Sequence, residues 1–144
     1  MTRYILDASV AARFLLSESL SAEATAVLRD YIEGRVELAA PSILTYEVGN
    51  ALWKAVRNKS MELDAAEAKQ RNLIGLDIPT VELDSGDHRD ILDWAHTHDA
   101  TYYDGAYVTA AKKLGSTLLT ADNKLYRKSS EAQSTQHLKD YVAG

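Results

Sequence analysis

The chain contains no cysteine, and this absence excludes disulfide frameworks, zinc ribbons and thiol nucleophiles. It also lacks any apolar run near the ~20 residues that a membrane-spanning helix needs, so we expect no membrane partner. No secretory leader precedes the first apolar segment, and these absences together fit a reducing, cytoplasmic setting. The composition, 46% hydrophobic and 26% charged over 144 residues, is typical of a folded chain. We expect one domain over residues 1–144.

Positive charge is in deficit, because 16 Lys and Arg face 21 Asp and Glu, for a formal net charge of -5. A negative net charge does not favour binding of a nucleic acid by overall electrostatic attraction. A polyanionic substrate would therefore need local compensation from a bound divalent cation and a basic cluster. The candidate RNA contacts are Arg13, Lys124, Arg127 and Lys128, although each one alone is also typical of a solvated surface.

The opening segment indicates a central strand. Tyr4, Ile5 and Leu6 form a short apolar run with good strand propensity, and a strand that is apolar on both faces must be covered on both faces. The run stops at Asp7, and a helix-compatible stretch over 10–16 follows at once. Asp7 is thus predicted at the carboxyl end of a central parallel strand, the edge at which such sheets bind ligands.

Strand and helix patterns alternate along the rest of the chain. Hydrophobic periodicity predicts helices over 21–33, 41–58, 61–74, 87–98 and 104–114, and strands over 36–40, 78–83, 100–103 and 116–120. The polar segment 129–136 is predicted to be a loop, followed by a short terminal element over 138–142. This alternation predicts an α/β fold with a mostly parallel sheet and right-handed crossovers.

Three aspartates share one predicted context. Asp7, Asp104 and Asp122 each end an expected strand and precede an expected helix. Each one alone is typical of a helix N-cap. Because the carboxyl ends of parallel strands lie at one edge of a sheet, we expect the three side chains to converge on one crevice.

Glu47 lies inside a predicted helix, where capping cannot explain it. Its position is roughly 60° from Leu44, on the shoulder of the apolar stripe, so its carboxylate should point along the margin of the core. The alternative is a solvated side chain paired with Lys54 or with a neighbour on another helix. If Glu47 joins the three aspartates, the four groups raise one another's pKa unless a cation neutralises them. Oxygen-only ligands favour Mg²⁺ or Mn²⁺ over Zn²⁺.

Such a cation would activate water for attack on phosphorus and offset the charge of the phosphoryl group. Ser9 and Thr120 each lie two residues from one of the aspartates. Their hydroxyls would either orient the carboxylates or serve as ordinary turn hydroxyls. The rings of Tyr102, Tyr103 and Tyr107 would stack on bases, although core packing is the expectation for at least two of them.

Four segments resemble, in order and spacing, the motifs of PIN domains, and most closely those of VapC-type ribonuclease toxins. They are Leu6-Asp7-Ala8-Ser9, the helical run from Tyr46 to Leu52, Tyr103-Asp104-Gly105-Ala106-Tyr107, and Leu119-Thr120-Ala121-Asp122. The resemblance implies a three-layer α/β/α sandwich around a five-stranded sheet of order 3-2-1-4-5, with the Asp7 strand in the middle. Gly105 departs from the family pattern, which more often has Ala, and this implies a looser helix start.

The same resemblance implies a Mg²⁺- or Mn²⁺-dependent endoribonuclease, a hydrolase that is often a homodimer and is inhibited by a small VapB-type antitoxin. Carried over residue by residue, Asp7, Glu47, Asp104 and Asp122 form the catalytic and metal-binding acidic cluster. Asp7 and Asp104 are the main ligands, and Thr120 is a supporting hydroxyl.

Two other classes fit parts of the pattern. A non-catalytic PIN-like binding module would have the same fold with a vacant site, and retention of all four carboxylates argues against it. A phosphoacceptor receiver domain needs adjacent acids after the first strand and a phosphorylatable Asp at the end of the third. Asp7 stands alone, which disfavours this class.

Overall fold

The computed structural model describes residues 1–131 and 133–144, and four of its strands form one parallel sheet. The strand order is β2 (Glu37–Ala39), β1 (Arg3–Leu6), β3 (Thr117–Thr120) and β4 (Thr135–His137). In register, Ile5 of β1 lies opposite Ala39 on one side and Leu118 on the other. The strand that leads to Asp7 is therefore interior, as predicted.

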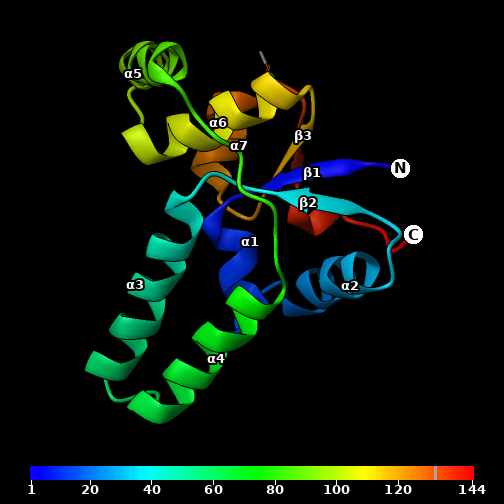
Figure 1. The fold of residues 1–144 in the computed structure, drawn as a ribbon, viewed down its shortest axis with the longest axis vertical. Helices are drawn as coiled ribbons and strands as arrows, with labels where there is room; N and C mark the ends of the chain where they lie inside the picture. The colour runs from blue at the N-terminus through cyan, green and yellow to red at the C-terminus, as the bar shows by residue number, and fades with distance from the viewer. Residues whose placement is uncertain (132) are drawn as a thin grey trace.

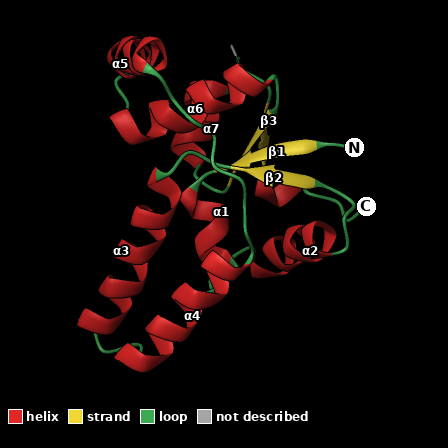
Figure 2. Cartoon of the chain, in the orientation of Figure 1, coloured by secondary structure: helices red, strands yellow, loops and turns green. Residues whose placement is uncertain are grey.

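Helices cover both faces of this sheet. They are α1 (Ala8–Arg13), α2 (Ser21–Ile32), α3 (Ile43–Arg57), α4 (Leu63–Gly75), α5 (Ser85–His98), α6 (Tyr102–Leu114), α7 (Asn123–Ser129) and the short 3-10 helix η1 (Leu138–Asp140). Helices α6 and α7 lie on one face, and α1 and α2 lie on the other (Figure 1). Helices α3 and α4 form a hairpin that extends away from the sheet (Figure 2).

The two faces of β1 explain its continuous apolar run. Ile5 packs with Val108 and Leu118 in the core beneath α6, whereas Leu6 packs with Val27 and other residues in the core beneath α2. Both side chains are fully buried. A strand enclosed in this way needs apolar residues at successive positions, which is the pattern in the sequence.

The prediction of a five-stranded sheet is wrong for the segment 78–83. This segment makes one isolated parallel bridge, between Thr80 and Ala40 at the end of β2. The Ala40 N–H donates to Pro79 O at 3.1 Å, and the Val81 N–H donates back to Ala40 O at 2.9 Å. Pro79 has no N–H to extend the ladder, so pairing stops after one bridge. The segment nevertheless lies where the outermost strand was expected, beside β2.

The predicted strand over 100–103 is also wrong, because α6 starts there. Thr101 is the N-cap of α6, and its hydroxyl accepts the Asp104 N–H at 3.0 Å. Asp104 therefore lies in the first turn of a helix and not at the end of a strand. Conversely, the tail predicted to be a loop contains β4, in which Thr135 pairs with Leu118 of β3. Within the described residues, no helix has the length and apolar character to cross a membrane.

Candidate active site at the carboxyl edge of the sheet

Asp7 forms the centre of the site, where β1 ends and α1 begins. Its carboxyl group is only 4% exposed. One oxygen, Oδ1, accepts the Ser9 hydroxyl at 2.6 Å and the Val10 N–H at 3.2 Å, and Oδ2 accepts the Thr120 hydroxyl. Burial raises the pKa of Asp7 to about 6, although these three hydrogen bonds offset part of the rise. The capping role proposed as the alternative is therefore present, and roughly one lone pair of Oδ2 remains unused.

The hydroxyls of Ser9 and Thr120 connect Asp7 to the neighbouring strand. Ser9 Oγ accepts the Ala121 N–H at 2.8 Å, just after β3. Thr120 Oγ1 accepts the Asp122 N–H at 3.0 Å while its own proton points to Asp7. The ends of β1 and β3 are thus held together by side chains as well as by the sheet, and Asp122 is held beside them.

Asp122 is the N-cap of α7. Its Oδ1 accepts the backbone N–H groups of Lys124 at 2.8 Å and Leu125 at 3.1 Å. No hydrogen bond to Oδ2 comes from the described residues, and the side chain is exposed. Its negative charge raises the pKa of both Asp7 and Asp104. Asp122 therefore caps its helix with one oxygen and leaves the other available at the site.

Asp104 approaches the same region from the first turn of α6. Burial is the main cause of its raised pKa, followed by the charges of Asp122 and Glu47. The Thr101 side chain and the Lys128 ammonium act in the opposite direction. Two carboxylates from other elements therefore lie close enough to disfavour the ionisation of Asp104.

Glu47 of α3 is held by Tyr107, for which the sequence predicted base stacking or core packing. Tyr107, which is 1% exposed, donates a 2.6 Å hydrogen bond from its hydroxyl to Glu47 Oε1. Glu47 is thus anchored to α6 and makes no ion pair with Lys54, the alternative raised from the sequence. The signal for Tyr107 was its spacing, because residues three apart on a helix share a face and Asp104 lies three positions earlier.

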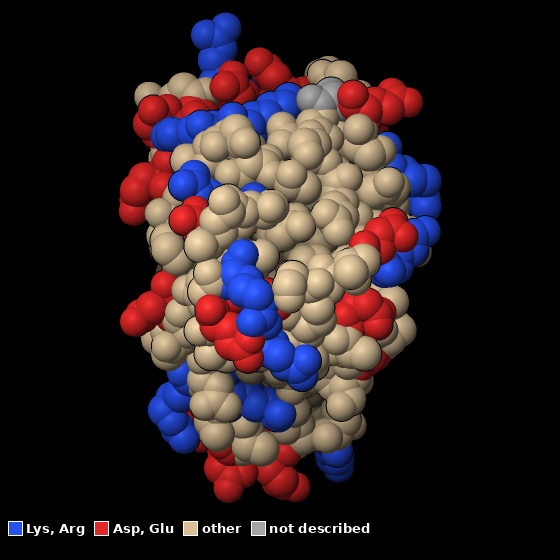
Figure 3. Space-filling model, turned by 90° about the vertical axis from the view of Figure 1, so that its right-hand side faces the viewer, with Lys and Arg blue, Asp and Glu red and all other residues tan. Residues whose placement is uncertain are grey.

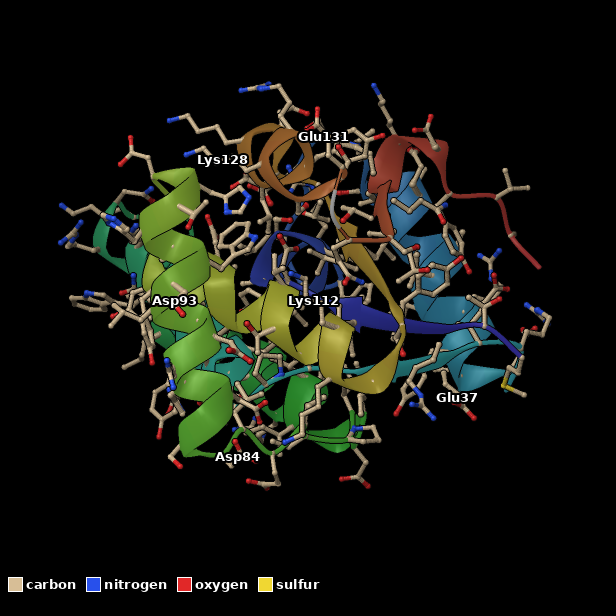
Figure 4. All side chains as sticks on the ribbon, turned by 90° about the horizontal axis from the view of Figure 1, so that it is seen from above. Glu37, Asp84, Asp93, Lys112, Lys128 and Glu131 are labelled. Carbon is tan, nitrogen blue, oxygen red and sulfur yellow. The ribbon has the colours of Figure 1, made fainter. Side chains whose placement is uncertain are left out.

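The basic candidates differ in how near they come to the carboxylates. Lys128 donates to Asp99 O at 2.6 Å, across from the end of α5 (Figure 4), and lies close enough to affect Asp104. Arg13 is tied into its own turn by donating to Ser9 O at 2.7 Å and Ser19 O at 2.8 Å. The side chains of Lys124 and Arg127 are exposed on α7.

The opposite side of the molecule, where the strands begin, shows no continuous basic surface. There, Lys and Arg side chains alternate with Asp and Glu around a broad uncharged area (Figure 3). Arg3 and Glu37, for example, form an ion pair in which Arg3 Nε lies 3.1 Å from Glu37 Oε2. Local positive charge at the site therefore comes from α7 and from the basic side chains beside α1 and α3.

The donor set suits a hard divalent cation in chemistry, because every candidate ligand atom is a carboxylate or hydroxyl oxygen. In geometry, no three His, Asp or Glu side chains in the described part of the chain lie close enough together to hold an ion as they stand. Asp122 is exposed and Asp104 is half-buried, so both have room to move, whereas Asp7 does not. Holding an ion would therefore require Asp104 and Asp122 to turn toward Asp7.

A family model described as the PIN domain matches residues 4–131. The chain belongs to the PIN-domain family. A curated relative, Ribonuclease VapC3 of Pyrobaculum aerophilum, is 30% identical over 128 residues, which cover 88% of this chain and 94% of the relative. Exonuclease VapC9 of the same organism is 29% identical over 112 residues, covering 75% and 79%. The resemblance predicted from four short motifs is confirmed.

Solved structures show the same PIN fold. PAE2754 from Pyrobaculum aerophilum superposes with a TM-score of 0.71 at 25% identity, covering 96% of this chain and 90% of that one. FitAcB from Neisseria gonorrhoeae superposes with a TM-score of 0.64 at 17% identity, covering 95% and 99%. At this low identity, the second likeness shows the fold alone.

Gly105, where this PIN domain departs from the expected motif, lies at a close approach of two helices. A Cβ there would stand 3.0 Å from both the carbonyl oxygen and a methyl carbon of Ile91, and 3.4 Å from the Trp94 ring. The helix start is not loosened, since α6 is regular from Tyr102 onward. Glycine instead lets α5 pack tightly behind Asp104.

Proposed function

We propose that this PIN-domain protein is a metal-dependent ribonuclease that hydrolyses phosphodiester bonds within RNA. The observation that carries the proposal is the gathering of carboxylates from separate elements around Asp104, whose pKa is raised by burial and by the charges of Asp122 and Glu47. Such repulsion costs free energy unless a cation offsets it. The relative named Ribonuclease VapC3, matched along 94% of its length, supports RNA as the substrate.

Asp7, Glu47, Asp104 and Asp122 would hold Mg²⁺ or Mn²⁺, with Asp7 and Asp104 as the main ligands. The cation, when bound, supplies an activated water and offsets charge on the phosphoryl group. Ser9 and Thr120 orient Asp7 through their hydroxyls, and Tyr107 positions Glu47. Lys128, beside Asp104, would attract the phosphate of the substrate.

Cleavage within the chain is supported by the shape of the site. Glu47 and Ser9 line a groove of about 490 Å³ that is open to solvent. An RNA strand can pass through such a groove without presenting a terminus. The names of the relatives include both a ribonuclease and an exonuclease, so the mode of cleavage must be tested directly.

We further propose that the protein acts as a toxin, assembles as a homodimer and is inhibited by a small VapB-type antitoxin protein. The VapC names of both curated relatives support this role. The hairpin of α3 and α4 exposes large apolar side chains, including Trp53, Leu63 and Ile74. Exposed apolar surface of this kind is typical of a protein partner's binding site.

The function is tested with linear and circular forms of one RNA incubated with Mn²⁺. We expect the circle to be opened, and we expect both EDTA and Asp104→Asn to stop the reaction. Asp93→Asn, at an exposed position on α5 that does not line the groove containing Glu47, is the matched control and should cleave normally. Cleavage that survives EDTA and Asp104→Asn would reject this site. A circle that stays intact while the linear RNA is shortened would reject cleavage within the chain.

A further inference from the structure

Two exposed tyrosines lie next to site carboxylates on different elements. Tyr46 precedes Glu47 on α3, and Tyr103 precedes Asp104 on α6. They are 74% and 52% exposed, whereas Tyr107, the third tyrosine near the site, is buried. The expectation that at least two of Tyr102, Tyr103 and Tyr107 belong to the core is therefore wrong.

The faces of these two rings are free. Within the described residues, neither Tyr46 nor Tyr103 stacks on another aromatic ring. Tyr102 differs, because it stacks on His88 with ring centroids 5.9 Å apart and is hydrogen-bonded to the same residue at 2.6 Å. Tyr46 and Tyr103 thus offer exposed rings without an aromatic partner among the described residues, in the hollow that also contains Glu47.

Both rings line the same two hollows. The first is the groove of about 490 Å³ that contains Glu47, and it is also lined by Arg13 and Lys54. The second, of about 270 Å³, has mostly apolar lining residues such as Ile43 and Leu83. The two tyrosines therefore stand between a polar, charged groove and an apolar hollow. This division matches a nucleotide, whose phosphate is charged and whose base is flat and largely apolar on its faces.

The charges around the tyrosines favour a nucleic acid as the occupant. Lys54 makes no ion pair with any described residue, so its ammonium is available to a phosphate. On the outer surface of α5, Asp90 and Asp93 are exposed and offer a polyanion no positive charge, whereas Asp87 is paired with Lys113. A strand crossing the carboxylates would accordingly run toward α3 and pass the two rings.

We propose that Tyr46 and Tyr103 form a base-stacking subsite that holds an unpaired nucleobase beside the scissile phosphate. The inference rests on the proposed ribonuclease function and adds the requirement that the RNA be single-stranded at this point. In an RNA duplex the base faces are stacked on one another and are out of reach of these rings. Stacking accepts any base, because every base has a π-face.

The test uses single-stranded oligoribonucleotides, each with one abasic nucleotide at a different position around the cleavage site. Binding is measured by fluorescence anisotropy in the Asp104→Asn background, so that affinity is read without turnover. We expect one position at which removal of the base weakens binding by about 5- to 150-fold, the range for stacking on an aromatic ring. Adding Tyr46→Ala and Tyr103→Ala should abolish the penalty at that position, and the Phe substitutions should preserve it.

Trp53→Ala is the control, since Trp53 is exposed on the same helix as Tyr46 but does not line either hollow. It should leave the abasic profile unchanged. A profile without a sensitive position, or a penalty that persists in the alanine variants, would overturn the subsite. The subsite would also be overturned if sedimentation showed that the alanine substitutions turn a dimer into monomers while binding of the intact and abasic strands is unchanged. If the protein without substitutions cleaves no RNA, the proposed function fails; normal cleavage of every abasic strand overturns the subsite alone.

Discussion

The hydroxyl of Tyr107 donates a 2.6 Å hydrogen bond to the carboxylate of Glu47, which joins α6 to α3 at the site. Glu47 lies in mid-helix, where no cap or turn fixes its side chain. Tyr107 is buried and lies one helical turn after Asp104, so the bond ties Glu47 to the helix that carries Asp104. The position of Glu47 therefore depends on a core residue.

Tyr107→Phe keeps the ring and removes this bond. We expect the Mn²⁺-dependent rate of RNA cleavage to fall by about 10- to 150-fold, because a hydrogen bond to a charged group contributes about 1.5–3 kcal/mol and about 1.4 kcal/mol corresponds to tenfold. Tyr31→Phe is the matched control, since it loses a 2.9 Å bond to Leu76 O away from the site. The control should lose stability and still cleave normally. Equal cleavage by both variants would contradict the positioning role.

The raised pKa of Asp7 predicts an unusual dependence of stability on pH. Burial moves this pKa from 3.8 to about 6, so between pH 4 and 6 the folded chain binds more protons than the unfolded chain. The free energy of unfolding should therefore fall as pH rises through this window, by roughly 3 kcal/mol in total.

Asp7→Asn removes this titration. Without metal, the variant should be more stable than the unsubstituted protein at pH 8, by up to roughly 3 kcal/mol, and the difference should largely disappear at pH 4. Urea unfolding in EDTA at the two pH values measures it. Asp90→Asn, at an exposed position on α5, should show no such dependence. If the two proteins differ equally in free energy of unfolding at pH 4 and at pH 8, ionisation of Asp7 does not destabilise the folded state.

Gly105→Ala tests the close packing of α5 on α6. The added methyl group would lie 3.0 Å from the backbone carbonyl oxygen of Ile91. A backbone atom cannot move away by a rotamer change, as the end of a flexible side chain can. We expect a loss of about 1–3 kcal/mol in the free energy of unfolding, the usual range for overpacking. Gly75→Ala, at a position with open space, is the control and should not destabilise the protein. If Gly105→Ala is as stable as the unsubstituted protein, α5 can shift away from α6 at no cost in stability.

The interior of the sheet could be predicted because its signal is local. Tyr4, Ile5 and Leu6 are apolar in succession and end at a polar residue, which both defines a buried strand and places Asp7 at its end. The segment before Asp104 misled the prediction because Tyr102 and Tyr103 have high strand propensity. The Thr101 hydroxyl instead caps a helix whose following residues are buried, and this tertiary packing is not visible in the local propensity.

The edges of the sheet could not be predicted in the same way. Strand β4 is short and polar, and it exists because β3 offers it a partner through pairs such as Thr120 with His137. The bridge at Thr80 depends likewise on the end of β2. The bond from Tyr107 to Glu47 joins residues 60 positions apart, and local periodicity carries no signal for it.

The buried carboxylate of Asp30 predicts an acid transition. It accepts hydrogen bonds from the Tyr141 hydroxyl, from the Gly144 N–H at 2.8 Å and from Arg35 at 2.8 Å, and these bonds lower its pKa to about 2. Its contribution to stability is therefore present above pH 4 and is lost as pH falls from 4 toward 2. Tyr141→Phe should unfold at a higher pH than the unsubstituted protein in an acid titration followed by circular dichroism. Tyr126→Phe is the control, and identical acid midpoints for both would contradict the anchoring role.

Calorimetric titration with Mn²⁺ tests most directly whether the four carboxylates act as one cation site. We expect saturable binding that Glu47→Gln and Asp122→Asn each weaken by at least the roughly tenfold effect that even outer partners of a metal site produce. Asp93→Asn should bind as the unsubstituted protein does. Binding that is the same in all four proteins would contradict a shared cation site, because it would show that the ion does not depend on these side chains.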